Sequence, residues 1–186
     1  MVRFIFFVVA SISLLGACGN EIPKMGPDGK PLPKLYRLRQ QTTAEVQFRT
    51  LDAVNALRVS AQRSALVLNA SLNAAAATHA RDMSAQNRPW HFGSDGSSPL
   101  DRVARAGYKY QLITELISET YETELETLSV WMENPDTRRD LLDKRANEMG
   151  FSWYQELSGK IWWTLVLGSG PDEKALTEDL ALIMDE

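Results

Sequence analysis

The feature that most constrains the fold is the segment of residues 161–167, which is nearly all apolar or aromatic. A strand with apolar side chains on both faces needs cover on both sides of its sheet. Just before it, Phe151, Trp153 and Leu157 alternate, and the pair Ser158-Gly159 offers a tight turn. These residues predict two strands joined by a hairpin, with other elements packed on both faces of the sheet.

Helices are predicted upstream of these strands. The longer ones are expected over residues 43–62, 71–86 and 121–133. Their apolar residues recur at helical spacing. In the first and the last of them, the predicted buried residues are Phe48, Leu51, Val54, Leu57 and Ala61, and Leu125, Leu128 and Trp131 or Met132. The last helix is expected to stop before Pro135, because the residue before a proline disfavours helical geometry.

A short additional helix has clear boundaries. Ser98 suits the N-cap, Pro99 the first helical position and Gly107 the end. Helices before the sheet and apolar strands within it predict an α/β protein. We expect a three-layer α/β/α sandwich with a small, mostly antiparallel central sheet.

The N-terminus is typical of an export signal. Residues 1–3 carry a positive charge and residues 4–15 carry none, and this uncharged run is too short to span about 30 Å of hydrocarbon. It ends in Leu15-Gly16-Ala17-Cys18, the pattern of a lipobox. Cys18, the only cysteine, is the predicted lipidation site. A plain secretory signal is the alternative, but Leu15 fits its cleavage rule poorly.

The predicted organisation follows from this start. Residues 1–17 form the signal peptide with its lipobox, 18–42 a lipidated tether rich in proline and glycine, 43–170 the folded domain, and 171–186 an acidic C-terminal tail. We expect an exported protein, lipid-anchored to the cell envelope. The residue after Cys18 is Gly19 and not aspartate, which favours the outer membrane in a cell with two membranes.

Composition excludes some partners. The formal net charge is −4 and no Lys/Arg cluster stands out along the sequence, so nucleic acid is not expected to bind. With one cysteine, the folded domain is expected to lack disulfides.

Five segments, in order, carry a resemblance to a known family. They are LDAVNALR, which includes Asn55 and Arg58, then LNAAAATHARDM, WHFGSDGSSPLDRVARAGYKY, ITELIS and WMENPDTRRDLLDKRANEMGF. Together, over residues 51–168, the sequence resembles the CAP superfamily (SCP domain) of cysteine-rich secretory proteins, antigen 5 and plant pathogenesis-related proteins. It is most similar to the cysteine-poor bacterial branch.

The resemblance implies an α/β/α sandwich with an open cleft lined by histidines and acidic residues. Some members bind zinc, other divalent cations, sterols or other lipids there. His91 matches the first cleft histidine and Glu115 the glutamate of the Gly-Glu-Asn motif, while Glu133 is a second acidic candidate. Thr137 stands where the bacterial pattern has its second histidine. His91 and Glu115 are therefore the candidate metal ligands, and zinc is the candidate cofactor, although threonine is a poor zinc ligand.

Simpler interpretations compete with these roles. His91, between two aromatic residues, is equally explained as a packed, hydrogen-bonded histidine. His79 lies on the apolar stripe of its helix and is expected in the core. Ser94, Ser97 and Ser98 lie near His91 but suit a turn and a helix cap. Neither a Gly-x-Ser-x-Gly nor a His-Glu-x-x-His motif occurs, which favours a non-enzymatic role.

Three functions remain open from the sequence. The leading hypothesis is a membrane-tethered binding module for a lipid-like or cell-wall ligand. The alternatives are a metal-assisted hydrolase or peptidase of the envelope, and a structural or adhesive envelope protein with a relic cleft.

Overall fold

The computed structural model describes residues 36–120 and 122–171. The predicted signal peptide, Cys18, most of the predicted tether and nearly all of the acidic tail lie outside these residues. Within them, no helix has both the length and the apolar character needed to cross a bilayer. Leu38, in the range assigned to the tether, is buried in the core, so packing of the domain includes residues before 43.

A four-stranded sheet forms the middle layer, in the order β1-β3-β4-β2. Its strands are β1 (Val67–Leu68), β2 (Leu112–Thr120), β3 (Glu148–Gln155) and β4 (Ile161–Gly168). Only the β1–β3 pair is parallel, and β4 pairs antiparallel with both of its neighbours. The sheet is therefore small and mostly antiparallel, as the sequence predicted.

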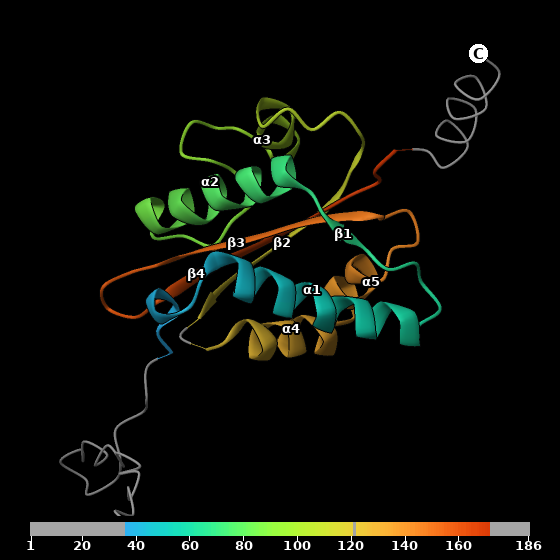
Figure 1. The fold of residues 1–186 in the computed structure, drawn as a ribbon. Helices are drawn as coiled ribbons and strands as arrows, with labels where there is room; N and C mark the ends of the chain where they lie inside the picture. Colours follow the sequence, from blue (N-terminus) through green and yellow to red (C-terminus); the bar gives the residue numbers. More distant parts are fainter. Residues whose placement is uncertain (1–35, 121, 172–186) are drawn as a thin grey trace, which may run out of the picture. The chain divides into compact units, whose positions relative to one another are not determined.

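Helices cover both faces of this sheet. On one side lie α2 (Ala70–Gln86) and α3 (Pro99–Arg105), and on the other lie α1 (Thr43–Ser60), α4 (Glu124–Glu133) and α5 (Pro135–Leu141) (Figure 1). Every residue of β4 is buried between the two layers. The prediction of a three-layer α/β/α sandwich is confirmed, and its reason is the strand whose two faces are both apolar.

Capping residues set the helix starts. Capping boxes begin α1, α3 and α4 at Thr42, Ser98 and Thr123. The short helix predicted between Ser98 and Gly107 is confirmed. Helix α5 is not predicted by the sequence analysis, because a proline just after a helix is expected to end it. In the structure Asn134 caps a new helix and Pro135 occupies its first turn.

Two predicted core positions are wrong, because Phe48 is 56% exposed and Leu125 is 42% exposed. Leu157, which the alternation of apolar residues placed in the first strand of the hairpin, lies instead in the turn between β3 and β4 and is 87% exposed. The buried face of α1 is instead formed by Val46, Thr50, Val54 and Arg58. The apolar stripe therefore predicted the wrong buried face of α1, because two of the residues on the observed face, Thr50 and Arg58, are polar.

Candidate functional site

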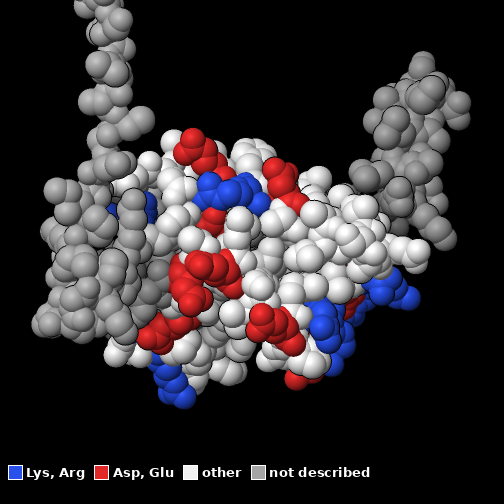
Figure 2. Space-filling view, turned by 90° about the horizontal axis from the view of Figure 1, so that it is seen from below, with Lys and Arg blue, Asp and Glu red and all other residues white. Residues whose placement is uncertain are grey.

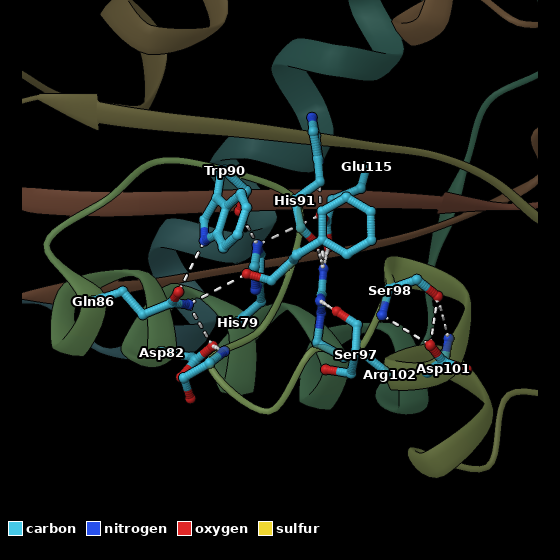
Figure 3. Close-up of polar contacts among 12 residues, drawn as sticks. His79, Asp82, Gln86, Trp90, His91, Ser97, Ser98, Asp101, Arg102 and Glu115 are labelled. Atoms are coloured by element: carbon cyan, nitrogen blue, oxygen red, sulfur yellow. Dashed lines mark hydrogen bonds and ion pairs between the residues drawn. The ribbon is translucent and has the colours of Figure 1, made fainter.

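Glu115 lies at the centre of a polar cluster between β2 and the layer of α2 and α3 (Figure 3). Side chains alternate between the faces of a strand. Leu116, the next residue, packs in the core on the side of α1 and α4, so Glu115 is directed to the opposite face. Its side chain is 3% exposed, and a carboxylate at this depth needs compensating partners.

Arg102 of α3 supplies the main compensation. Its Nη2 lies 2.9 Å from Oε1 and 2.8 Å from Oε2 of Glu115. The same guanidinium donates to the carbonyl oxygens of Ser97 and His91, at 3.0 and 2.9 Å. Arg102 therefore joins the strand, the helix and the intervening loop into one unit.

His91 connects this buried pair to solvent. Its Nδ1 lies 2.9 Å from Oε1 of Glu115, so Nδ1 carries the hydrogen and donates a hydrogen bond to the carboxylate. The His91 side chain is 50% exposed. The sequence interpretation placed His91 and Glu115 together, and the structure shows the contact between them.

His79 of α2 closes the cluster from inside. It is fully buried, as predicted, but its Nε2 hydrogen-bonds the carbonyl oxygen of Trp90 at 3.0 Å and lies 3.6 Å from Oε1 of Glu115. Its Nδ1 has no hydrogen-bond partner among the described residues. His79 is thus both a core residue and a neighbour of the site.

The environment shifts two pKa values in the cluster. Burial raises the pKa of Glu115, but the hydrogen bond from His91 and the charge of Arg102 outweigh it, so this pKa lies below its usual value. Burial lowers the pKa of His79, and the charge of Glu115 opposes this only in part. At neutral pH, Glu115 is therefore ionised and His79 is neutral.

The loop that carries His91 is fixed by side chains of α2. Asp82 accepts from the backbone nitrogen of Ser94 at 2.8 Å and from its hydroxyl at 2.6 Å. Gln86 accepts from Nε1 of Trp90 at 2.9 Å (Figure 3). These bonds hold the residues on both sides of His91, so its position is defined before any ligand arrives.

The other two candidates of the sequence analysis lie elsewhere. Thr137 is in α5, where its hydroxyl donates to the carbonyl oxygen of Trp131 at 2.5 Å, and Glu133 is exposed at the end of α4. Both helices belong to the layer opposite α2 and α3 (Figure 1). The structure therefore brings His91 and Glu115 together but places Glu133 and Thr137 in the other layer.

The cluster does not fit a zinc ion. In the described residues, no group of three or more His, Cys, Asp or Glu side chains is arranged to hold a metal. Both carboxylate oxygens of Glu115 already face the guanidinium of Arg102, whose positive charge would repel a cation at that position. A divalent ion would have to displace that buried contact.

Sequence reasoning missed Arg102 and underestimated His79. The available signal was a titratable residue on an otherwise apolar helix face: Arg102 precedes the buried Val103, and His79 lies between the buried Ala76 and Met83. Such residues, buried together, commonly pair with one another.

Comparisons with known proteins agree with the fold. The model of the cysteine-rich secretory protein family (CAP) matches residues 51–167. An outer surface protein of Borrelia burgdorferi has a TM-score of 0.63 at 16% identity, covering 69% of this chain and 95% of that one. An extracellular SCP-domain protein of Bacillus anthracis has a TM-score of 0.63 at 20% identity, covering 74% and 45%. No match was found among curated proteins.

A third structure, a cysteine-rich secretory protein of Staphylococcus aureus, has a TM-score of 0.58 at 14% identity and covers 77% of this chain. This chain spans less than half of the Bacillus and Staphylococcus chains, at 45% and 44%. These likenesses concern the fold, and the family match concerns the sequence over most of the described domain. Because the family model matches more than half of the sequence, this chain belongs to the CAP family.

Proposed function

We propose that this chain is an exported, non-enzymatic binding module of the cell envelope, anchored by lipid at Cys18, whose ligand is lipid-like or another envelope component. One observation carries the proposal. The carboxylate of Glu115 is buried and already bound by Arg102 and His91, whereas the outer side of His91 is exposed. The cluster therefore positions the exposed surface of His91 for recognition. The carboxylate of Glu115 is already engaged by Arg102 and His91, and is not free to react with a substrate.

The electrostatics of Glu115 argue against acid–base catalysis by this carboxylate. An effective general acid or base has a pKa near the working pH. The pKa of Glu115 is shifted in the opposite direction, below its usual value, although burial alone would raise it. A carboxylate that stays ionised and paired with Arg102 is suited to holding His91 in place.

Residues 88–92 combine apolar and polar groups at the surface. Phe92 is 49% exposed, and its ring centroid lies 5.7 Å from that of Trp90. The guanidinium of Arg88 stacks over the Trp90 ring, 3.8 Å from its centroid. An amphipathic ligand would contact the aromatic rings with its apolar part and place an acidic or hydrogen-bonding head near Arg88 and Nε2 of His91.

The proposed location has two supports. The lipobox ending in Cys18 is one, and the likeness in fold to an outer surface protein of Borrelia burgdorferi and an extracellular protein of Bacillus anthracis is the other. A binding module tethered by lipid would act beside the membrane, where amphipathic ligands are concentrated.

The runner-up is an envelope hydrolase in which His91 acts as a general base oriented by Glu115. The observation that favours it is the Nδ1 contact of 2.9 Å, which leaves Nε2 to accept a proton. This hydrolase would need a nucleophile or an activated water beside His91. Its test is hydrolysis of esters or peptides by the parent chain, which should disappear in the variant Glu115→Gln.

Native mass spectrometry tests the leading proposal. The chain from Asn20 onward is purified without chelators from a host with lipids and compared with His91→Ala and Phe92→Ala. Phe48→Ala is the matched control, since Phe48 is also exposed but lies on α1 in the opposite layer. We expect a bound amphiphile in the parent and the control, and about tenfold lower occupancy in the other two variants.

Two outcomes would overturn the proposal. One is a bound mass that both substitutions at 91 and 92 leave intact, which would remove this surface from ligand binding. The other is a ligand-free mass in all four proteins after incubation with lipid extracts, which would favour a structural role.

A further inference from the structure

A second surface feature lies away from the Glu115 cluster. It is a hollow of about 470 Å³, and none of its lining residues belongs to that cluster. The lining residues are Arg63, Pro135, Arg138, Arg139, Leu142, Asp143, Lys144 and Arg145. Five cationic side chains and a single carboxylate therefore surround one hollow in a chain whose net charge is −4.

Three of these cations have no acidic partner. Among the described residues, no carboxylate lies within ion-pair distance of Arg63, Arg138 or Lys144. Arg139 and Arg145 differ, because they pair with Asp136 and Asp143 at 3.0 and 2.7 Å. The unpaired cations repel one another, and an anion between them would relieve that repulsion.

A buried charge lies behind the hollow. Arg58 of α1 is fully buried, and its guanidinium donates only to carbonyl oxygens. These oxygens belong to Ser64, Leu141, Asp143 and Ala146, at 2.9, 2.7, 3.1 and 2.8 Å. The segment from 141 to 146, of which residues 142–145 line the hollow, thus wraps around a cation that forms no ion pair with any described residue. Its field adds to that of the surface cations.

The fold assembles this cluster from separate segments. Arg63 follows α1, Arg138 and Arg139 are in α5, and the remaining two cations are in the turn after α5. Arg63 is held in place by the hydrogen bond from its Nε to the carbonyl oxygen of Leu142, at 2.9 Å. Figure 2, which views the layer of α1, α4 and α5 from below, shows acidic side chains over its centre, and Lys and Arg side chains at its right-hand end, above the centre and at the lower left.

We propose that this hollow is an anion site that binds a phosphate group carried by a lipid headgroup or by a soluble phosphate ester. Phosphate offers several acceptor oxygens around one centre, and the guanidinium and ammonium groups that line the hollow are matching donors. Arginine forks suit phosphate geometry in particular. This site is separate from the surface at His91 and does not depend on its role.

The test uses the full chain in a neutral detergent and isothermal titration calorimetry. The probes are sn-glycerol 3-phosphate and detergent micelles doped with dioleoylphosphatidylglycerol, with dioleoylphosphatidylcholine as the neutral lipid. The variant is Arg138→Gln with Lys144→Gln, which leaves the Arg63 hydrogen bond intact. The matched control is Arg37→Gln with Lys109→Gln, because it removes the same charge from exposed positions outside the hollow.

We expect the double variant to bind the anionic probes about tenfold more weakly or worse, and the control to stay within about twofold of the parent. Binding by the parent should also weaken as salt is raised. Equal responses to both anionic probes would assign the site to soluble phosphate esters, and a response to phosphatidylglycerol alone would assign it to lipid headgroups. Equal losses in variant and control, or no loss in either, would overturn the proposal.

Both substituted side chains are exposed, so the variant is expected to fold, and far-ultraviolet circular dichroism checks this. Lys144→Gln alone is the second variant. Lys144 donates no hydrogen bond to another described residue, so a loss of binding in this variant cannot come from a disrupted internal contact.

Discussion

Nη2 of Arg102 lies within 2.9 Å of both carboxylate oxygens of Glu115, and neither side chain is more than 5% exposed. The pair links α3 to β2, and the same guanidinium holds the loop of His91 through carbonyl oxygens. A buried ion pair contributes little net stability when intact, but losing one partner strands the other charge. The fold of this region therefore depends on both residues being present.

Substituting Arg102→Met is expected to lower the free energy of unfolding by about 3–5 kcal/mol, because the carboxylate of Glu115 stays buried without its cation. The double change Arg102→Met with Glu115→Leu is expected to recover much of this loss. Urea unfolding followed by tryptophan fluorescence measures both. Arg105→Met is the control on the same helix, since its pair with Asp95 is exposed and should leave the midpoint unchanged. A similar midpoint for Arg102→Met and Arg105→Met would contradict a structural role for the pair.

Acidification is expected to destabilise the domain in two steps. The pKa of buried His79 is lowered from 6.5, so its contribution to stability is full above pH 6.5 and is lost as pH falls toward its folded pKa. The pKa of Glu115 is also lowered, despite burial, from 4.5, so its contribution is full above pH 4.5 and is lost below. In both cases the unfolded chain binds the proton first.

Urea midpoints between pH 7.5 and pH 4.5 check the upper step, with His79→Gln as the variant that cannot titrate. Its midpoint is expected to be lower at every pH, but to fall less steeply between pH 6.5 and pH 5 than that of the parent. Parallel curves would exclude His79 as the group responsible.

Much of the fold could be predicted from local signals. The doubly apolar β4 required cover on both faces, and Ser98 and Gly107 marked the ends of α3. Burial was predicted wrongly at positions where a polar residue faces the core. Thr50 and Arg58 replace the expected apolar stripe of α1, because their polar groups are satisfied by backbone carbonyls that the sequence does not display.

Only part of the candidate site could be predicted from the sequence, because buried polar contacts between distant residues leave no local pattern. His91 and Glu115 were found through the family resemblance, but their partner Arg102 was not, since a buried ion pair between α3 and β2 leaves no spacing pattern. The basic hollow was invisible because Arg63 lies 75 residues before Arg138 in the sequence and reaches it only through the fold.

Arg58 is a charged residue on the buried face of α1, and its hydrogen bonds explain why this position holds an arginine. Its three nitrogens donate to four carbonyl oxygens in two separate segments, so it acts as an internal clamp. Arg58→Met is expected to cost about 3 kcal/mol or more, because several buried carbonyls lose their donors. Arg58→Lys should recover only part, since an ammonium cannot span that fork. Urea unfolding measures the difference. Arg63→Met, which removes one exposed carbonyl contact, is the control, and an equal cost for the two positions would refute the clamp.

Gly150 marks the closest approach of α2 to the sheet. A Cβ atom at this position would overlap backbone atoms of Leu72 and Asn73, and backbone cannot rotate away as a side chain can. The same contact is fixed by a hydrogen bond of 2.8 Å from the backbone nitrogen of Phe151 to Oδ1 of Asn73. Gly150→Ala is therefore expected to lower the free energy of unfolding by about 1–3 kcal/mol. Ser152→Ala, two residues along the same face of β3, is the control and should change stability less. Thermal unfolding of both variants decides the matter, because equal midpoints would show that α2 has room to move away from the strand.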